Sequence, residues 1–299
     1  MLPEQNWRAD AIVRLLISIF ICIYAGSLAS SAVHYFQGGK TDVLFAWVAG
    51  AGFISLAAAM FFIRSRLTLE NLFRKMGATL GFFYLGLMLG MWAHKIAGSP
   101  RVSVISMIIS ALAFQGAVVA LVVIFLREQG LRWRDSFGWA ARPLRAVLIG
   151  IGVGLVFLPI GWTCQMLTAE IIERLPGLQF KASEQVSVQT LRMASSLLHK
   201  TVLAITTILL APAAEELLFR GVLYKWIQQL GYPNLAVWGL SIVFAAIHVN
   251  ALTFPALFLL SLILTILYER TGNLLAPITA HASFNAANFS LLYWFQHGI

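Results

Sequence analysis

Residues 201–227 decide the fold class of this chain, with the sequence TVLAITTILLAPAAEELLFRGVLYKWI. The stretch is long enough to cross a bilayer as one helix, because about 20 apolar residues span the hydrocarbon core. It nevertheless carries Glu215, Glu216 and Arg220 close together. Each charged group at the centre of a membrane helix costs roughly 3 kcal/mol on insertion scales. We therefore expect these three groups to have partners inside the protein and a function that requires them.

The composition of the whole chain is that of an integral membrane protein. Of its 299 residues, 60% are hydrophobic and only 11% are charged, whereas a soluble domain carries about 25% charged residues. The sequence predicts an all-α, polytopic transmembrane helical bundle of eight or nine helices. The predicted apolar segments are residues 11–33, 43–63, 77–97, 102–126, 144–167, 201–227, 233–249, 252–268 and 273–296.

The net charge of +9 reflects membrane topology rather than nucleic-acid binding, because the cations lie mostly in short connections between apolar segments. Arginine and lysine are concentrated at residues 64–75 and 127–145. Cytoplasmic loops of membrane proteins are enriched in these residues. We expect both connections and the N-terminus to be cytoplasmic, the lipid bilayer to be a partner, and nucleic acid not to be one.

The predicted helices fall into two groups. Residues 1–130 hold four helices with almost no polar chemistry inside the membrane, and residues 131–299 hold all the polar clusters described below. In the second group, Gly150, Gly152 and Gly154 are small enough to let the fifth helix approach its neighbours closely. We therefore divide the chain into an N-terminal membrane region and a chemically active core.

The connection between these two groups has a composition of its own. Residues 127–143 combine arginines with Trp133, Phe137 and Trp139. A mixture of cations and aromatic rings is typical of an amphipathic segment that lies on anionic headgroups. The sequence predicts such an interfacial segment here.

Glu215, Glu216 and Arg220 form the first of three polar clusters. Because helical residues four apart lie on one face, Glu216 and Arg220 have the spacing of an ion pair. Glu215 lies about 140° around the helix from Arg220 and is therefore the unpaired carboxylate.

Two more clusters follow, Phe244-x-x-x-His248 and His281-x-x-x-Asn285. Each cluster alone has an ordinary explanation, because a histidine or an asparagine in a membrane helix can simply hydrogen-bond to a neighbouring helix. Together with Glu215 they supply a general base, proton carriers or metal ligands, and an oxyanion donor. We expect all four polar groups to converge on one cavity that opens to the cytoplasmic side.

The three motifs, in this order and on hydrophobic helices, resemble those of the CPBP intramembrane metalloproteases. That family includes type II CAAX prenyl endopeptidases and bacteriocin-processing or immunity proteins of the Abi type. The resemblance covers about residues 200–296 and leaves the first four helices outside. It implies that residues 131–299 form an intramembrane protease core in which Glu215 activates the attacking water. Glu216 and Arg220 would orient the site.

The resemblance also gives roles to the remaining motif residues. His248 would assist Glu215 or bind a metal, and His281 with Asn285 would stabilise the oxyanion. The residues make no cofactor certain. Zinc is the candidate, since it takes three protein ligands and a water and Glu215, His248 and His281 could supply them. Pairing of Glu216 with Arg220 leaves a single free carboxylate, which favours a mechanism without an obligatory metal.

The sequence therefore predicts an intramembrane endopeptidase, multi-pass in the cell membrane and specifically in a bacterial inner membrane. A glutamate-activated water would hydrolyse a peptide bond in a membrane-associated protein or peptide. One alternative is a non-catalytic membrane scaffold or bacteriocin-immunity factor that uses the polar cluster to bind a partner. A second is a proton-coupled transporter, although the chain lacks the inverted repeat common in that class.

Overall fold

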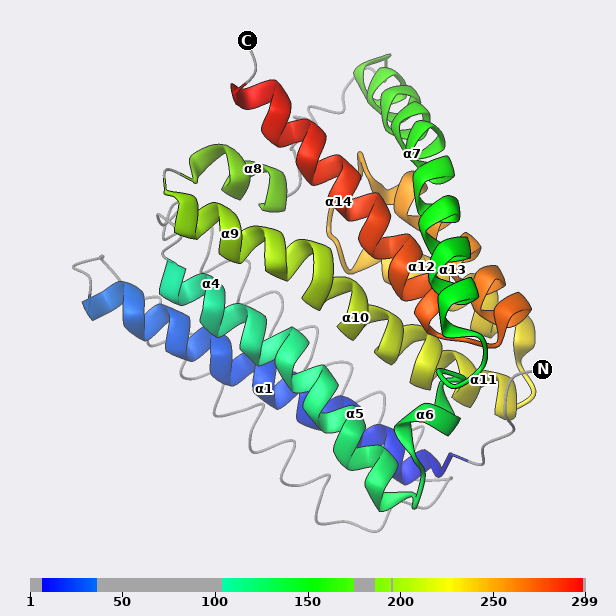
Figure 1. Cartoon of the computed structure of the whole chain (residues 1–299). Coiled ribbons are helices and arrows are strands. Elements are labelled where there is room, and N and C mark those ends of the chain that lie inside the picture. Colours follow the sequence, from blue (N-terminus) through cyan, green and yellow to red (C-terminus); the bar gives the residue numbers. More distant parts are fainter. Residues whose placement is uncertain (1–6, 37–103, 175–185, 195, 298–299) are drawn as a thin grey trace. The chain divides into compact units, whose positions relative to one another are not determined.

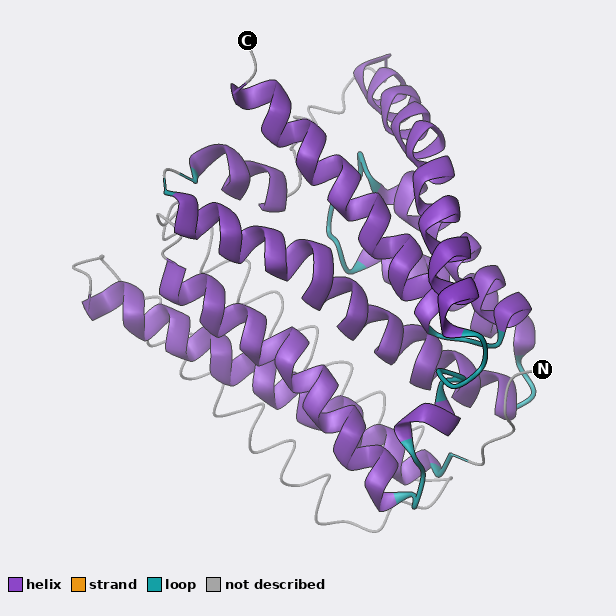
Figure 2. Cartoon of the chain, viewed as in Figure 1, coloured by secondary structure: helices purple, strands orange, loops and turns teal. Residues whose placement is uncertain are grey.

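The computed structural model describes residues 7–36, 104–174, 186–194 and 196–297. Every regular element within these ranges is a helix, as Figures 1 and 2 show, and this confirms the all-α prediction. The predicted helices at residues 43–63 and 77–97, and the connection at 64–75, lie outside the described ranges.

Five helices in the described part of the chain are long and apolar enough to cross a membrane. They are Ala9–Ser27, Val104–Glu128, Pro143–Arg174, Leu197–Gln229 and Phe254–Thr271, and Leu235–Ala246 is a shorter apolar helix. These positions confirm that the chain is a multi-pass membrane protein. The predicted orientation of its loops stays a prediction.

The contacts divide the chain into two compact units, Arg8–Leu121 and Met1–Trp7 with Val122–Ile299. In the first unit α1 (Ala9–Phe36) packs against α4 (Val104–Ala111) and the π-helical η1 (Leu112–Gly116). The hydroxyl of Ser30 donates to the carbonyl of Ser106 at 3.3 Å. The sequence-based boundary at residue 130 stays a prediction, because compactness alone does not define a functional division.

The second unit is built around one long helical run (Figure 1). Its parts are α9 (Leu197–Ile205), η2 (Thr206–Leu210), α10 (Ala211–Glu216), η3 (Leu217–Tyr224) and α11 (Lys225–Gln229). The two η segments are π-helical. Short π segments inside α-helices occur frequently at functional sites. Here η2 precedes the first polar cluster, and η3 contains its Arg220.

The most extensive helix contact in the described part of this unit joins α7 (Pro143–Arg174) to α14 (Leu275–His297). A Cβ atom added to Gly150 would lie 1.9 Å from the hydroxyl oxygen of Thr279, and one added to Gly154 would lie 2.2 Å from the carbonyl oxygen of Ala280. These two glycines therefore let the helices approach, as predicted. Gly152 differs, because an added Cβ would meet nothing within 4 Å.

A helical hairpin lies between the long helical run and α14 in the sequence. The π-helical η4 (Leu235–Gly239) continues into α12 (Leu240–Ala246), and α13 (Phe254–Thr271) returns beside it. The helix predicted over residues 233–249 ends early, so His248 lies in the turn after α12. In that turn the side chain of Asn250 accepts a hydrogen bond from the backbone N–H of Thr253.

The segment predicted to lie on headgroups, residues 127–143, is buried in protein at Ser136 and Phe137, and most of its other residues are exposed. Its contact with headgroups stays a prediction. The segment begins in the last two residues of α5 (Ala117–Glu128) and contains α6 (Trp133–Ser136). Phe137 is fully buried and packs where Gly221 leaves room, with 2.8 Å between its ring and a Cβ added to that glycine. The ammonium group of Lys225 donates to the carbonyl of Ser136 at 2.5 Å. These two contacts anchor the segment to η3 and α11.

Candidate active site

The first polar cluster lies at the junction of α10 and η3. Glu215 is 9% exposed, Glu216 0% and Arg220 2%. Burying three ionisable groups is costly unless each finds a partner. The partners therefore show what this region is built to hold in place.

Glu216 and Arg220 form the ion pair that their spacing predicts. Arg220 Nη1 donates to Glu216 Oε1 at 2.9 Å. The same oxygen lies 3.1 Å from Nδ1 of His281, on α14. An ionised carboxylate only accepts hydrogen bonds, so Nδ1 of His281 carries the hydrogen in this contact. Glu216 thus fixes the histidine of the third motif, a contact across 65 positions of sequence.

Arg220 is held from its other side by α13, a helix that carries none of the three motifs. Its Nη2 donates to the backbone carbonyl of Ser261 at 2.8 Å and to the hydroxyl of Ser261 at 2.6 Å. Its Nε donates to the hydroxyl of Thr265 at 3.4 Å. Sequence reasoning missed Ser261 and Thr265. The sequence did contain a signal for them, since two hydroxyl residues four apart mark one face of the helix in its apolar part, before Tyr268.

The ring of Phe244 lies at the centre of the cluster. Its centroid is 4.9 Å from the guanidinium carbon of Arg220, 5.1 Å from the ring of His248 and 5.8 Å from the ring of His281. A guanidinium over an aromatic face gains a cation–π attraction that strengthens when water is excluded. The phenylalanine of the second motif is therefore a packing platform for both histidines and the arginine.

His248 is oriented by its own helix end. Its Nδ1 lies 2.7 Å from the carbonyl oxygen of Phe244. A carbonyl can only accept, so Nδ1 carries the hydrogen and Nε2 is the unprotonated nitrogen of the neutral ring. The next residue, Val249, has a φ of 48°, which is strained for a β-branched side chain. The turn that presents His248 is thus held in an unfavourable backbone conformation.

Glu215 is the carboxylate that the network does not occupy. Its Oε2 is buried and has no hydrogen-bond partner among the described residues. Both His281 and His248 lie within electrostatic range of it. The structure therefore brings Glu215, Glu216, Arg220, His248 and His281 together. Oε2 of Glu216 is likewise buried without a partner among the described residues, but Glu216 is already engaged through Oε1, which leaves Glu215 as the carboxylate that can bind a small polar molecule such as water.

Asn285 lies one turn beyond His281 on α14 and has a different contact. Its side-chain nitrogen donates to the backbone carbonyl of Thr207, in η2, at 2.9 Å. A primary amide has two N–H groups, so one remains for another acceptor. Convergence of Asn285 on the same cavity as Glu215 stays a prediction.

Zinc is the cofactor for which the sequence offers candidate ligands. No group of three or more His, Cys, Asp or Glu side chains there is arranged to hold a metal ion. Nδ1 of both histidines is already engaged, with Phe244 and with Glu216. Zinc binding by Glu215, His248 and His281 stays a prediction, and no step proposed below depends on it.

Comparison with known proteins agrees with the resemblance seen in the motifs. The family described as "Type II CAAX prenyl endopeptidase Rce1-like" matches residues 197–287, a segment that runs from α9 into α14. The "Uncharacterized protein YpbD" of Bacillus subtilis (strain 168) is 39% identical over 93 residues. That match covers 30% of this chain and 44% of the relative, so the chain spans less than half of the length of this curated relative. No solved structure matches.

Proposed function

We propose that this protein is an intramembrane endopeptidase that hydrolyses a peptide bond in a membrane-associated protein or peptide, with a water activated by Glu215. The observation that carries the proposal is the buried Glu215 oxygen without a hydrogen-bond partner in the described residues. It lies beside two oriented histidines, within the segment similar to a prenyl endopeptidase family.

The first step is the binding of a water by Glu215, which satisfies its unpaired oxygen. A buried polar atom left without a partner costs about 1–3 kcal/mol, and more when it is charged. A water bound to Glu215 removes that cost and is held by a base that can take its proton. The water oxygen then attacks the carbonyl carbon of the scissile peptide bond. The proton passes to the leaving amine when the C–N bond breaks, so one water is consumed per bond.

The histidines and the amide complete the reaction. His248 has Nε2 as its unprotonated nitrogen in the neutral ring and can share the proton with Glu215. The second N–H of Asn285 supplies a donor for the negative oxygen that forms during attack. His281, whose Nδ1 hydrogen is used by Glu216, supplies a second donor from Nε2 when the ring is an imidazolium with both nitrogens protonated. Donors that are already oriented stabilise such an oxyanion without reorganising. Arg220 is a positioning residue, since it acts through Glu216.

The test compares membrane proteins from cells that carry the wild type, Glu215→Gln or Glu170→Gln at equal protein levels. Glu170 is an exposed carboxylate of α7 and serves as the matched control. New peptide termini are identified by mass spectrometry of the membrane fraction. We expect termini that require the wild type, persist in Glu170→Gln and disappear in Glu215→Gln. A phenotype that survives in Glu215→Gln with no termini lost would favour the non-catalytic scaffold.

The Glu215→Gln substitution should lower the cleavage rate strongly. A positioned general base contributes typically about 10²–10⁴-fold to a reaction, and the glutamine keeps shape while removing basicity. With a purified protein and one identified substrate, Glu215→Gln should therefore lose at least about 100-fold in cleavage rate. Thermal unfolding in detergent should stay close to that of the wild type, which separates loss of chemistry from loss of fold.

A further inference from the structure

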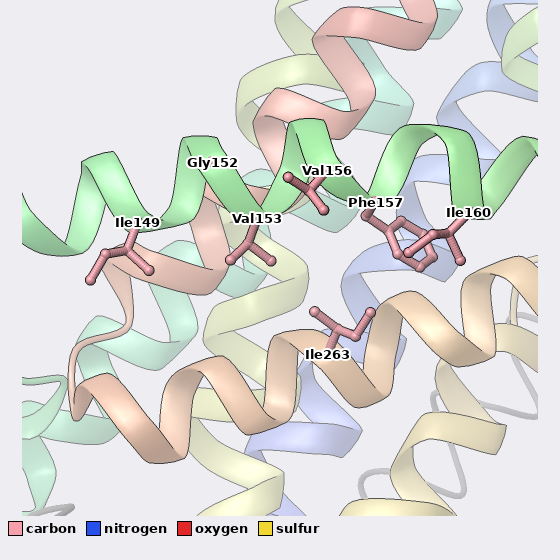
Figure 3. A pocket seen from close by; sticks show the side chains of 7 residues that line it. All are labelled: Ile149, Gly152, Val153, Val156, Phe157, Ile160 and Ile263. Carbon is pink, nitrogen blue, oxygen red and sulfur yellow. The ribbon is translucent and has the colours of Figure 1, made fainter.

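A second feature of the core unit lies away from the polar cluster. α7 and α13 pack against each other and leave a groove of about 430 Å³ between them, shown in Figure 3. Its walls are entirely apolar and include none of the motif residues. They are formed by Ile149, Val153, Val156, Phe157 and Ile160 of α7 and Ile263 of α13.

The α7 side of the groove continues into a cationic end. Residues three, four or seven apart share a helix face, so the face of Ile149 and Val156 extends one turn back to Arg145. Arg145 is exposed, and no ion pair joins it to any other described residue. Arg142, also exposed, directly precedes the first residue of α7.

The α13 side of the groove also ends at an exposed arginine. Arg270 lies two turns after Ile263 and therefore on the same face of α13. It is exposed and likewise has no ion pair among the described residues. The end of α13 is tied to the start of α7, because the side chain of Asn273 donates to the carbonyl of Ala141 at 2.8 Å. Both arginines are thus at one end of the groove.

The dimensions of the groove suit one membrane leaflet. From Ile149 to Ile160 the α7 wall runs about 16 Å at 1.5 Å per residue, close to half of the roughly 30 Å hydrocarbon core. Gly152 widens the groove, since an added Cβ would meet nothing within 4 Å. Gly150 and Gly154, by contrast, are filled by α14. The close packing of α7 on α14 therefore does not explain Gly152.

We propose that this groove binds an anionic phospholipid, with one acyl chain along the apolar walls and the phosphate between Arg145 and Arg270. Basic pockets between transmembrane helices bind anionic lipid headgroups, and the two arginines provide the matching charge. The apolar walls exclude a polar ligand. This inference is independent of the proposed peptidase activity, because the groove and the polar cluster share no residue.

The headgroup is tested by native mass spectrometry of the purified full-length protein. The protein is exposed to phosphatidylglycerol and phosphatidylcholine with identical chains. Two basic residues near a lipid surface, each contributing about a factor of five, predict roughly tenfold or greater preference for phosphatidylglycerol. The double variant Arg145→Gln, Arg270→Gln should bind both lipids equally. The control Arg132→Gln, Arg134→Gln removes two exposed arginines that do not border the groove and should keep the preference.

The acyl chain is tested with two neighbouring residues of α7. Val156 lines the groove and Leu155 does not, although both are exposed, at 68% and 48%. Val156→Trp should lower retention of phosphatidylglycerol several-fold, and Leu155→Trp should leave it unchanged. Gly152→Leu provides a second way to fill the groove. Glycerol phosphate, which has the anion without the chain, should not be retained.

Three results would overturn the proposal. The first is equal retention of the two phospholipids by the wild type. The second is an equal loss of phosphatidylglycerol in the two arginine double variants. The third is a lipidated peptide without a phosphate that displaces phosphatidylglycerol and depends on Val156 but not on Arg145 and Arg270. That outcome would assign the groove to a lipid-modified polypeptide instead.

Discussion

Two glutamate–arginine pairs in this protein share one local geometry and lie in opposite surroundings. Glu216–Arg220 and Glu170–Arg174 are both four residues apart with the glutamate first. The side chains of the first pair are 0% and 2% exposed, and those of the second are 54% and 78% exposed. The same spacing therefore produces the centre of a buried network in one region and a surface contact near the end of α7 in the other.

The difference lies in the partners that other helices supply. Glu216 also contacts His281, and Arg220 is held by Ser261 and Thr265. No contact beyond their own pair is described for the side chains of the Glu170 pair. Helical spacing decides that a pair can form, while the surroundings decide what breaking it costs.

The largest expected effect comes from breaking the buried pair. Arg220→Met leaves Glu216 charged and buried, which should lower the free energy of unfolding by about 3–5 kcal/mol. Glu216→Ala should cost a similar amount, because it leaves Arg220 unpaired. Arg174→Met should cost less than about 0.5 kcal/mol. Unfolding in detergent measures all three variants. Equal losses for Arg220→Met and Arg174→Met would contradict the comparison.

A smaller effect is expected where α13 supports the arginine. Ser261→Ala removes a hydrogen bond to a charged group, which is worth about 1.5–3 kcal/mol, and should also slow cleavage because Glu216 and His281 lose their fixed geometry. Ser241 is the matched control. It is equally buried, but its hydroxyl donates to the uncharged carbonyl of Val237. Ser241→Ala should cost about 1 kcal/mol and leave the cleavage rate unchanged.

If Ser261→Cys or Ser261→Thr restores the rate of Ser261→Ala, the hydroxyl position is what matters. If Ser261→Ala lowers stability but keeps the wild-type cleavage rate, then the contact of α13 with Arg220 contributes only to the stability of the fold. In that case the description of Arg220 as a positioning residue fails.

The smallest effect extends the comparison to the backbone beside the buried network. Val249 has a φ of 48° and a side chain that is 79% exposed, so its replacement removes strain and little packing. Val249→Gly should raise the free energy of unfolding by about 1 kcal/mol. Ala246→Gly, at the last residue of α12, should lower it by about 0.5–1 kcal/mol. A lower free energy of unfolding in both variants would show that the turn is not strained.

Much of the fold could be predicted from local sequence. The apolar segments at residues 102–126, 144–167, 201–227 and 252–268 correspond to helices that can cross a membrane. Their prediction succeeds because the transfer of a segment into lipid depends on its own composition. The end of α12 could not be located in this way. It depends on the turn at Asn250 and Thr253, where a side chain bonds to the backbone and competes with the helix.

Part of the candidate site could be predicted for the same reason. The pairing of Glu216 with Arg220 requires only the geometry of one helix, and it left Glu215 as the unpaired carboxylate. The contacts of Phe137 could not be found from its own segment. Cations and aromatic rings alternate there as they do in interfacial helices, yet Gly221, far along the chain, leaves the space that buries the ring.

The sequence by itself determined the membrane helices, the ion pair within one motif and the resemblance to a peptidase family. These properties depend on composition and on helical spacing, which act within a few turns. Only the tertiary structure decided that His281 contacts Glu216, that Ser261 and Thr265 hold Arg220, and that Asn285 contacts Thr207. Each of these contacts joins residues of different helices. Their distances are set by the packing of whole helices against one another, which no short stretch of sequence encodes.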